Sequence, residues 1–224
     1  MKIVELFCGT KSISKAFEAA GHQCFTVDYD ASLNPSLAID ILKFNPDMLP
    51  QEFQSPDIVW ASPPCTTFSV ASMGHHWTGG KGAYIPRTEE AKVGLQLMKH
   101  TVDIIESLQP MVWFIENPRG LMRKLIGLHE STRHTVCYCR YGDKRMKPTD
   151  IWSNCQAWVP RAMCHNGNPD HEAAPRGAKT RTQGLKGAKE RSRIPEALCK
   201  DIVKASEEEV ISYIVVKFPL EGLK

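Results

Sequence analysis

Short apolar runs alternate with amphipathic segments over the first 118 residues of the chain. Short, largely apolar runs that end near Gly, Pro or Asp are typical of buried strands. We expect five such strands, at residues 2–7, 24–28, 37–40, 58–61 and 111–115.

Two segments between these runs carry apolar residues at helical spacing. Residues 12–20 end before Gly21, and residues 92–108 place apolar side chains from Val93 to Leu108 on one face. Strands that alternate with helices in this way form right-handed βαβ units around a parallel sheet covered on both faces. The pattern therefore predicts an α/β fold with a doubly wound, mostly parallel sheet.

The pattern changes after Pro118. Short strands are expected at residues 134–141 and 151–152. Residues 160–189 are rich in Pro, Gly, Asn, His and basic residues without apolar periodicity, which is typical of a loop. Residues 193–206 return to helical spacing, so we expect a closing helix there.

The composition describes an ordinary globular protein. Of the 224 residues, 42% are hydrophobic and 24% are charged, which excludes a collagen-like, disordered or disulfide-scaffold chain. One domain with a small appendage is expected. No apolar stretch approaches the ~18 residues of a membrane span, so no membrane partner is expected. The first residues form a strand pattern instead of a signal peptide, so we expect a cytoplasmic protein with reduced cysteines.

The net charge of +3 is unevenly distributed. Residues 119–200 contain 17 Lys and Arg against 7 Asp and Glu, whereas the flanking segments have an acidic excess. Such a basic block faces a polyanion or forms a solvated surface. We therefore expect a main α/β domain at residues 1–142, a small basic region at 143–190 and a C-terminal segment at 191–224 that returns to the main domain.

Ligands of an open parallel sheet bind at the carboxyl ends of its strands, and polar residues gather there in this sequence. Asp28 ends the second strand, where an acid is placed to hydrogen-bond a ribose, and Gly9 follows the first strand. The turn lacks the glycine-rich patterns of dinucleotide and phosphate loops, so NAD and ATP are weakly supported. Taken alone, Gly9 and Asp28 are equally consistent with an ordinary turn glycine and a loop acid.

Two residues at the same edge of the sheet have reactive side chains. Cys65 follows two prolines after the fourth strand, and these hold it on a stiff, exposed loop. It is a candidate nucleophile if a neighbouring group lowers its pKa or takes its proton; otherwise it is a small buried hydrophobic residue. Glu116 follows the fifth strand and is either an acid that contacts a substrate or a helix cap.

In their order along the chain, these motifs resemble the DNA cytosine-5 methyltransferases, in particular the short enzymes of phages and prophages. The resemblance covers nearly the whole chain and implies a Rossmann-like methyltransferase fold that binds S-adenosylmethionine. The matching catalytic motifs are Ser62-Pro63-Pro64-Cys65 and Phe114-Ile115-Glu116-Asn117. The matching cofactor-binding positions are Phe7, Cys8, Gly9, Thr10, Asp28, Tyr29, Asp40, Ile41, Pro63, Leu97, Ser192 and Arg193.

The resemblance also implies a covalent mechanism. The Cys65 thiolate adds to carbon 6 of cytosine, and carbon 5 then takes the methyl group of S-adenosylmethionine. Glu116 hydrogen-bonds ring nitrogen 3 and the exocyclic amine. This chemistry requires no metal, but the base must leave the duplex stack. The expected substrate is double-stranded DNA, bound by a monomer, in the cytoplasm or nucleoid of a bacterial host and in the setting of restriction and modification.

The sequence departs from the family where an arginine normally holds the cytosine carbonyl oxygen. That position falls on Thr149, so either Arg145 or Lys147 acts in its place or the site is weaker than in relatives. The final motif at Ser192 and Arg193 also lacks the usual Asn-Ser pair.

The resemblance leaves a small region, at about residues 150–190, for target recognition, so a target of roughly two to four base pairs is expected. Residues 70–87 contain four glycines and suit a loop that closes over DNA; a plain surface loop is the alternative. The expected DNA-binding residues are Ser69, His76, Lys81, Arg119, Arg176, Lys179, Arg181 and Lys186.

Three further interpretations stay open at this stage. The same catalytic set supports cytosine methylation of RNA, such as transfer RNA, and a catalytically silent relative would bind DNA without modifying it. A zinc site is the third. Cys155, Cys164, His165 and His171, with Cys139, are possible ligands, but they form no C-x-x-C pair, so we expect loop and core residues there.

Overall fold

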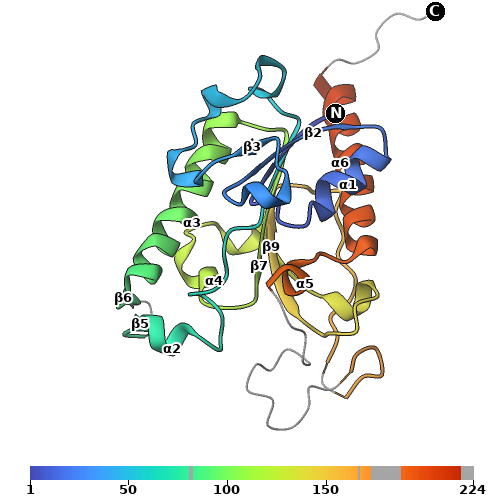
Figure 1. The fold of residues 1–224 in the computed structure, drawn as a ribbon. Helices are drawn as coiled ribbons and strands as arrows, with labels where there is room; N and C mark the ends of the chain where they lie inside the picture. The colour runs from blue at the N-terminus through green and yellow to red at the C-terminus, as the bar shows by residue number, and fades with distance from the viewer. Residues whose placement is uncertain (81–82, 166, 173–187, 218–224) are drawn as a thin grey trace, which may run out of the picture.

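A computed structural model describes residues 1–80, 83–165, 167–172 and 188–217 of the chain. Its centre is a seven-stranded sheet in the order β3-β2-β1-β4-β7-β9-β8, with helices on both faces (Figure 1). The strands are β1 (Lys2–Leu6), β2 (Gln23–Asp28), β3 (Leu37–Ala38), β4 (Ile58–Ala61), β7 (Val112–Pro118), β8 (Arg133–Cys137) and β9 (Pro148–Ser153).

The first five of these strands are parallel to one another. β1 pairs in parallel with β2 and β4, and the sheet grows outward from there through β3 on one side and β7 on the other. Because helices cover both faces, β4 is buried along its whole length and β1 along nearly all of it. The doubly wound, mostly parallel α/β fold expected from the sequence is confirmed.

The last two strands, β8 and β9, add antiparallel pairing to the sheet. β9 pairs antiparallel with both β7 and β8. The strand expected at residues 134–141 ends at Cys137, because Tyr138–Tyr141 form a short 3₁₀ helix, η6, that ends at Gly142. Gly142 has a φ of 88°, a left-handed conformation that glycine adopts without steric cost, and the chain turns back there towards β9.

Three long helices cover the sheet. α1 (Ser12–Ala19) and α6 (Glu196–Lys217) lie against each other on one face, and α3 (Glu89–Leu108) covers the opposite face (Figure 1). α3 begins after Thr88, whose side-chain oxygen accepts the backbone N–H of Ala91 at 3.2 Å. Such a cap satisfies one of the free N–H groups of the first turn and stabilises a helix by about 1 kcal/mol.

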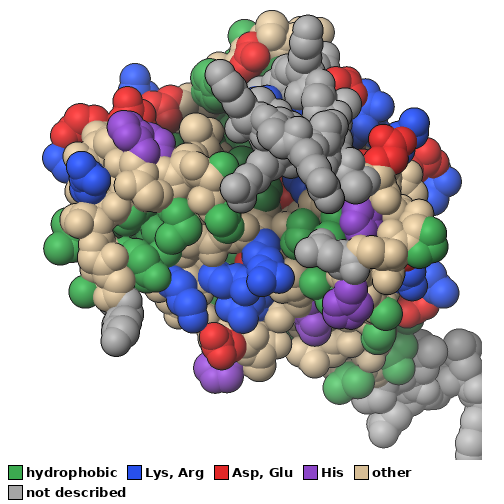
Figure 2. Space-filling model, turned by 90° about the horizontal axis from the view of Figure 1, so that it is seen from below, with side chains coloured by type: hydrophobic (Ala, Val, Ile, Leu, Met, Phe, Trp, Pro, Cys, Tyr) green, Lys and Arg blue, Asp and Glu red, His purple; other side chains and the backbone are tan. Residues whose placement is uncertain are grey.

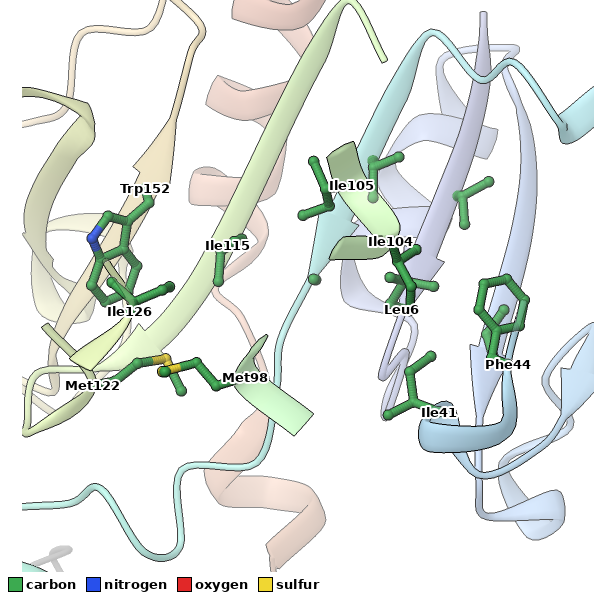
Figure 3. Packing of buried hydrophobic residues seen from close by; sticks show 14 of the residues in the cluster. Leu6, Ile41, Phe44, Met98, Ile104, Ile105, Ile115, Met122, Ile126 and Trp152 are labelled. Carbon is green, nitrogen blue, oxygen red and sulfur yellow. The ribbon is translucent and has the colours of Figure 1, made fainter. Parts of the chain in front are cut away.

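Two apolar clusters hold these layers together, and each large side chain buried in them contributes about 1.5–3 kcal/mol. The cluster between the sheet and α3 is drawn in Figure 3 and includes Leu6, Ile41, Phe44, Met98, Ile104, Ile105, Ile115, Met122, Ile126 and Trp152. The cluster between the sheet and the pair α1 and α6 includes Ile3, Phe17, Trp60, Phe114, Leu198 and Ile202.

Short elements connect these layers. β5 and β6 form a separate two-stranded antiparallel ladder. The short helices and strands are α2 (Met73–His76), β5 (Trp77–Thr78), β6 (Ile85–Pro86), α4 (Met122–Leu125) and α5 (Ala188–Ser192). The 3₁₀ helices other than η6 are η1 (Ala31–Leu33), η2 (Ile41–Lys43), η3 (Pro46–Met48), η4 (Gln51–Phe53) and η5 (Glu130–Thr132).

The expected basic region at residues 143–190 begins inside the main sheet, since β9 belongs to that sheet. Between β9 and α5 the described residues form no helix or strand, and residues 173–187 lie outside the described part of the chain. Among the described residues, no helix has the length and apolar character needed to cross a membrane.

Candidate active site

Cys65 stands on a loop that is fastened to the strand carrying Glu116. β4 ends at Ala61, and Ser62-Pro63-Pro64 leads the chain to Cys65, which is partly exposed. The carbonyl oxygen of Pro63 accepts a hydrogen bond of 2.8 Å from the side-chain Nδ2 of Asn117. Because Asn117 is completely buried and follows Glu116 in β7, this bond fixes the cysteine loop to the strand of the acid.

Glu116 is a buried acid inside β7, whereas the sequence placed it just after a strand. Only 6% of its surface is exposed, and its Oε1 accepts a hydrogen bond of 3.0 Å from the hydroxyl of Tyr138. Burial raises the pKa of Glu116, while the Lys147 ammonium and the Tyr138 hydroxyl oppose that shift. The carboxyl is therefore better able to hold a proton than an exposed glutamate.

Lys147 is the cation that accompanies this acid. Its Nζ lies 4.3 Å from the centre of the Tyr138 ring and donates a hydrogen bond of 3.0 Å to the carbonyl oxygen of Arg191. Burial lowers the pKa of Lys147, and the attraction of Glu116 and Cys65 opposes that shift. The ammonium therefore interacts with both residues of the predicted catalytic pair.

Arg145, the other candidate to replace the missing arginine, and Thr149, which stands at its position, are both bonded to other groups. The guanidinium of Arg145 is held by Asp143, with its Nε 3.0 Å from Oδ1 of the acid. Thr149 is completely buried, and its hydroxyl donates to the carbonyl oxygen of Lys147 at 3.1 Å. Of the three side chains, Lys147 is therefore the one that faces Cys65 and Glu116.

The surroundings of the Cys65 thiol disfavour its thiolate form. Burial raises its pKa, and the Glu116 carboxylate adds to that shift, whereas Lys147 opposes it. A thiolate is the reactive form of cysteine, so protonation of Glu116 and the charge of Lys147 both favour the nucleophile. The local electrostatics thus couple the acid, the cation and the thiol.

The predicted cofactor-binding residues lie at the carboxyl ends of β1 and β2. Asp28 accepts the backbone N–H of Gly9 at 2.9 Å and that of Asp30 at 3.1 Å, one on each carboxylate oxygen. Asp28 therefore ties the ends of the two strands together, and each oxygen keeps a further acceptor position for a ligand. Tyr29 beside it is 77% exposed, which leaves its ring free to stack.

Residues from the two ends of the chain meet at this edge. Ser192 Oγ lies 4.0 Å from the point where a Cβ on Gly9 would stand, and Ser12 Oγ accepts the N–H of Ile194 at 3.4 Å. Arg193 is exposed and lines a hollow of about 430 Å³ with Tyr141 and Asp143 among others. The structure thus brings Ser192 and Ile194 next to the residues that follow β1.

The other predicted cofactor positions differ in their accessibility. Phe7 and Thr10 are half-buried, and Cys8 and Pro63 are buried. Asp40 is exposed and caps η2 through the N–H of Leu42, while Ile41 belongs to the core. Leu97 lines a cleft of about 460 Å³ together with residues that flank Cys65, namely Pro64, Thr66 and Thr67.

The predicted DNA-binding residues are only partly described. Ser69 pairs its hydroxyl with that of Ser72 at 2.7 Å, and His76 Nδ1 lies 2.8 Å from Thr88 Oγ1. Arg119 is exposed. The face seen from below in Figure 1 gathers Lys and Arg side chains near its centre (Figure 2). Five further predictions, Lys81, Arg176, Lys179, Arg181 and Lys186, lie outside the described residues.

Sequence reasoning missed two groups of this site. Tyr138 had no signal beyond its place in an apolar run, yet it supplies the donor to Glu116 and the ring beneath Lys147. Arg191 was counted only as part of the basic block, but its charge also favours the Cys65 thiolate. A motif search could not find either residue, because neither lies within a matched motif.

Comparison with known proteins identifies the family. Residues 1–131, more than half of the chain, match the family described as C-5 cytosine-specific DNA methylase. The chain is also 32% identical over 220 residues to the "Probable DNA (cytosine-5)-methyltransferase" of Frog virus 3 (isolate Goorha), covering 91% of this chain and 99% of that protein. The chain belongs to the C-5 cytosine-specific DNA methylases. The resemblance inferred from the sequence motifs is confirmed, and with it membership in a family of methyltransferase enzymes.

A solved methyltransferase structure agrees with the fold of this methylase. The methyltransferase EhMeth of Entamoeba histolytica matches with a TM-score of 0.51 and 14% identity, over 75% of this chain and 57% of that one. A DNMT2 mutant of Spodoptera frugiperda matches with a TM-score of 0.43 and 18% identity, over 73% and 53%. The methylase spans little more than half the length of these solved structures.

Proposed function

We propose that this methylase transfers a methyl group from S-adenosylmethionine to carbon 5 of cytosine in double-stranded DNA through a transient bond between Cys65 and carbon 6. The observation that carries this proposal is the convergence of a partly exposed thiol, a buried carboxyl and an ammonium at one edge of the sheet. Membership in the DNA methylase family supports DNA as the methyl acceptor.

Glu116 makes the addition step possible. As the Cys65 sulfur forms its bond to carbon 6, ring electrons move towards carbon 5 and nitrogen 3. The raised pKa of Glu116 favours its protonated form, which donates to nitrogen 3 and stabilises that charge. After methyl transfer, water or another base takes the carbon 5 proton. The electrons of that carbon–hydrogen bond re-form the ring double bond as the sulfur–carbon bond breaks and Cys65 leaves as a thiolate.

Lys147 takes the role of the arginine that the sequence lacks. Its ammonium faces both Cys65 and Glu116, so it can stabilise the thiolate before addition and hold the carbonyl oxygen of the cytosine. The Tyr138 ring beneath Nζ and the Arg191 carbonyl restrict its motion. Tyr138 belongs to η6, and Arg191 belongs to α5, just before α6. The position of the Lys147 ammonium therefore depends on both of these elements.

The edge formed by β1 and β2 fits the cofactor. S-adenosylmethionine, when bound, supplies the methyl group. The exposed Tyr29 ring suits stacking on its adenine, and free acceptor positions on Asp28 suit its ribose hydroxyls. Ser192 beside Gly9 and Leu97 in the cleft next to Pro64 extend this edge towards Cys65.

A test compares Cys65→Ser with Cys24→Ser, a half-buried cysteine on β2. We expect Cys65→Ser to abolish transfer of labelled methyl groups to duplex DNA while cofactor binding persists, and Cys24→Ser to remain active. A duplex containing 5-fluorocytosine should trap the wild-type protein covalently, because fluorine at carbon 5 blocks the final elimination. Undiminished turnover in Cys65→Ser would refute the nucleophile.

The choice of acceptor distinguishes the remaining alternatives. Equal amounts of duplex DNA and transfer RNA are offered to the wild-type protein, and we expect methylation of cytosine in the DNA. Transfer to RNA alone would replace DNA with RNA as the substrate. Binding of DNA without methylation of either acceptor and without a trapped adduct would indicate a catalytically silent relative.

A further inference from the structure

Three metal-binding side chains converge outside the candidate active site. Cys139 belongs to η6, and Cys164 and His171 belong to the segment that follows β9. Their ligand atoms all lie within 4.8 Å of one another, and Cys164 Sγ is 3.4 Å from Nδ1 of His171. Both cysteines are buried, and the histidine is half-buried. The sequence offered these three residues among five possible zinc ligands, and the structure brings these three together.

These residues have the chemistry and approximate spacing of zinc ligands. With Zn–S bonds of about 2.3 Å and Zn–N bonds of about 2.0–2.1 Å, neighbouring ligand atoms of a tetrahedron lie roughly 3.5–3.8 Å apart. The distance between Cys164 and His171 is close to this value, and the remaining spacing requires only small rotations. We propose that Cys139, Cys164 and His171 hold a structural zinc ion.

Cys137 is the neighbour that completes the set. It is completely buried in the same small cluster, and its Sγ lies 3.8 Å from the carbonyl oxygen of Cys164 and 3.9 Å from Sδ of Met163. Cys137 lies outside the group of three whose ligand atoms are within 4.8 Å of one another, so its side chain would have to rotate to become the fourth ligand. Three cysteines with one histidine would then form a closed structural site. Each thiol releases its proton to solvent as it binds the metal.

Asp170 supports the site from outside. Its Oδ2 lies 3.8 Å from Cys164 Sγ and accepts a hydrogen bond of 2.8 Å from Arg140. Because this carboxylate already neutralises a guanidinium, it fits a role in positioning the ligands more readily than a role as a ligand. Carboxylates next to metal ligands fix side-chain orientation in many zinc sites.

The position of these ligands indicates which segments the zinc ion would hold together. Residues 154–172 contain no helix or strand among those described, so few backbone hydrogen bonds hold this segment. A zinc ion would fasten it to η6, where Tyr138 stands between Cys137 and Cys139 and donates to Glu116. The ion would thus anchor the segment that leads into residues 173–187 and steady the donor of the active site.

The test measures metal content in protein purified without a histidine tag from zinc-supplemented cells. We expect about one zinc ion per chain in the wild type and a loss of zinc in Cys164→Ser and His171→Ala. The matched controls are Cys155→Ser, whose thiol contacts the carbonyl oxygen of Ala205, and His165→Ala, an exposed neighbour. Both should keep the metal.

Several outcomes would overturn the proposal. These are a zinc-free wild type, a disulfide between Cys139 and Cys164 in freshly purified protein, or unchanged zinc in both ligand variants. Retention of zinc in Cys137→Ser would remove Cys137 from the ligand set. If the variants do not fold, cobalt is titrated into the zinc-depleted wild type under reducing conditions. A thiolate-to-cobalt absorption band is expected, and its absence would also contradict a cysteine-ligated site.

Discussion

Two buried glutamates lie on strands of the same sheet, and they differ in what faces them. Glu5 in β1 and Glu116 in β7 are 2% and 6% exposed, and burial raises the pKa of both. Glu5 accepts the backbone N–H of Ser14 at 3.0 Å, inside the layer between sheet and helix α1. Glu116 faces Tyr138, Lys147 and Cys65 at the open edge. Burial and a raised pKa therefore do not distinguish Glu5, which holds a helix, from Glu116, which is placed for catalysis. The groups that face each carboxyl do.

The largest expected effect is a difference in methyl-transfer rate between variants of these two acids. Glu116→Gln should lower the rate of methyl transfer by about 10²–10⁴-fold, because an amide cannot deliver a proton to nitrogen 3. Glu5→Gln should stay within about twofold of the wild type, since the Glu5 carboxyl binds the backbone of Ser14 in α1 and is not among the groups that shift the pKa of Cys65. Single-turnover transfer of labelled methyl groups measures both. Equal losses in the two variants would mean that Glu116 acts only on folding.

The second effect concerns how the free energy of unfolding depends on pH, to which Glu5 contributes. Burial raises the pKa of Glu5 to about 7 from an ordinary value of 4.5. Between these pH values the folded protein binds more protons than the unfolded chain, so stability falls as pH rises from about 4.5 and the loss is complete above about 7. Relative to Glu5→Gln, the wild type should lose roughly 3 kcal/mol over this range. Urea unfolding at pH 5 and pH 8 tests the difference, and identical pH dependence in both proteins would contradict it.

The smallest effect concerns the cation beside the catalytic acid. Lys147→Ala should slow methyl transfer about tenfold, which corresponds to about 1.4 kcal/mol of lost transition-state stabilisation. Lys147→Arg should recover part of the rate because it restores the positive charge. Lys99→Ala, an exposed lysine on α3, is the control. If the alanine variant matched this control, Lys147 would have no part in the chemistry.

The sequence was informative about features that consecutive residues determine. The strands at the start of the chain were predicted within about two residues, because buried parallel strands are short apolar runs with polar ends. Cys65 and Glu116 lie in contiguous motifs, so the sequence alone supports their selection, while their catalytic roles stay proposals. The structure adds that Glu116 lies inside β7 and that Asn117 binds the loop of Cys65.

The sequence was uninformative where residues meet through tertiary packing. The run at residues 134–141 has strand-like composition throughout, but the left-handed turn at Gly142 converts its second half into η6. That change sets the position of Tyr138 and Cys139. The choice between Arg145 and Lys147 likewise depends on which partners surround each side chain, and Asp143 is the acid that binds the guanidinium of Arg145.

The hydrogen bond from Asn117 to the Pro63 carbonyl oxygen has a mechanical consequence. It fastens the loop of Cys65 to the strand of Glu116, so the packing of β4 against β7 sets how far apart the sulfur and the carboxyl stand. A pyrimidine that enters the site would then meet both groups already in place.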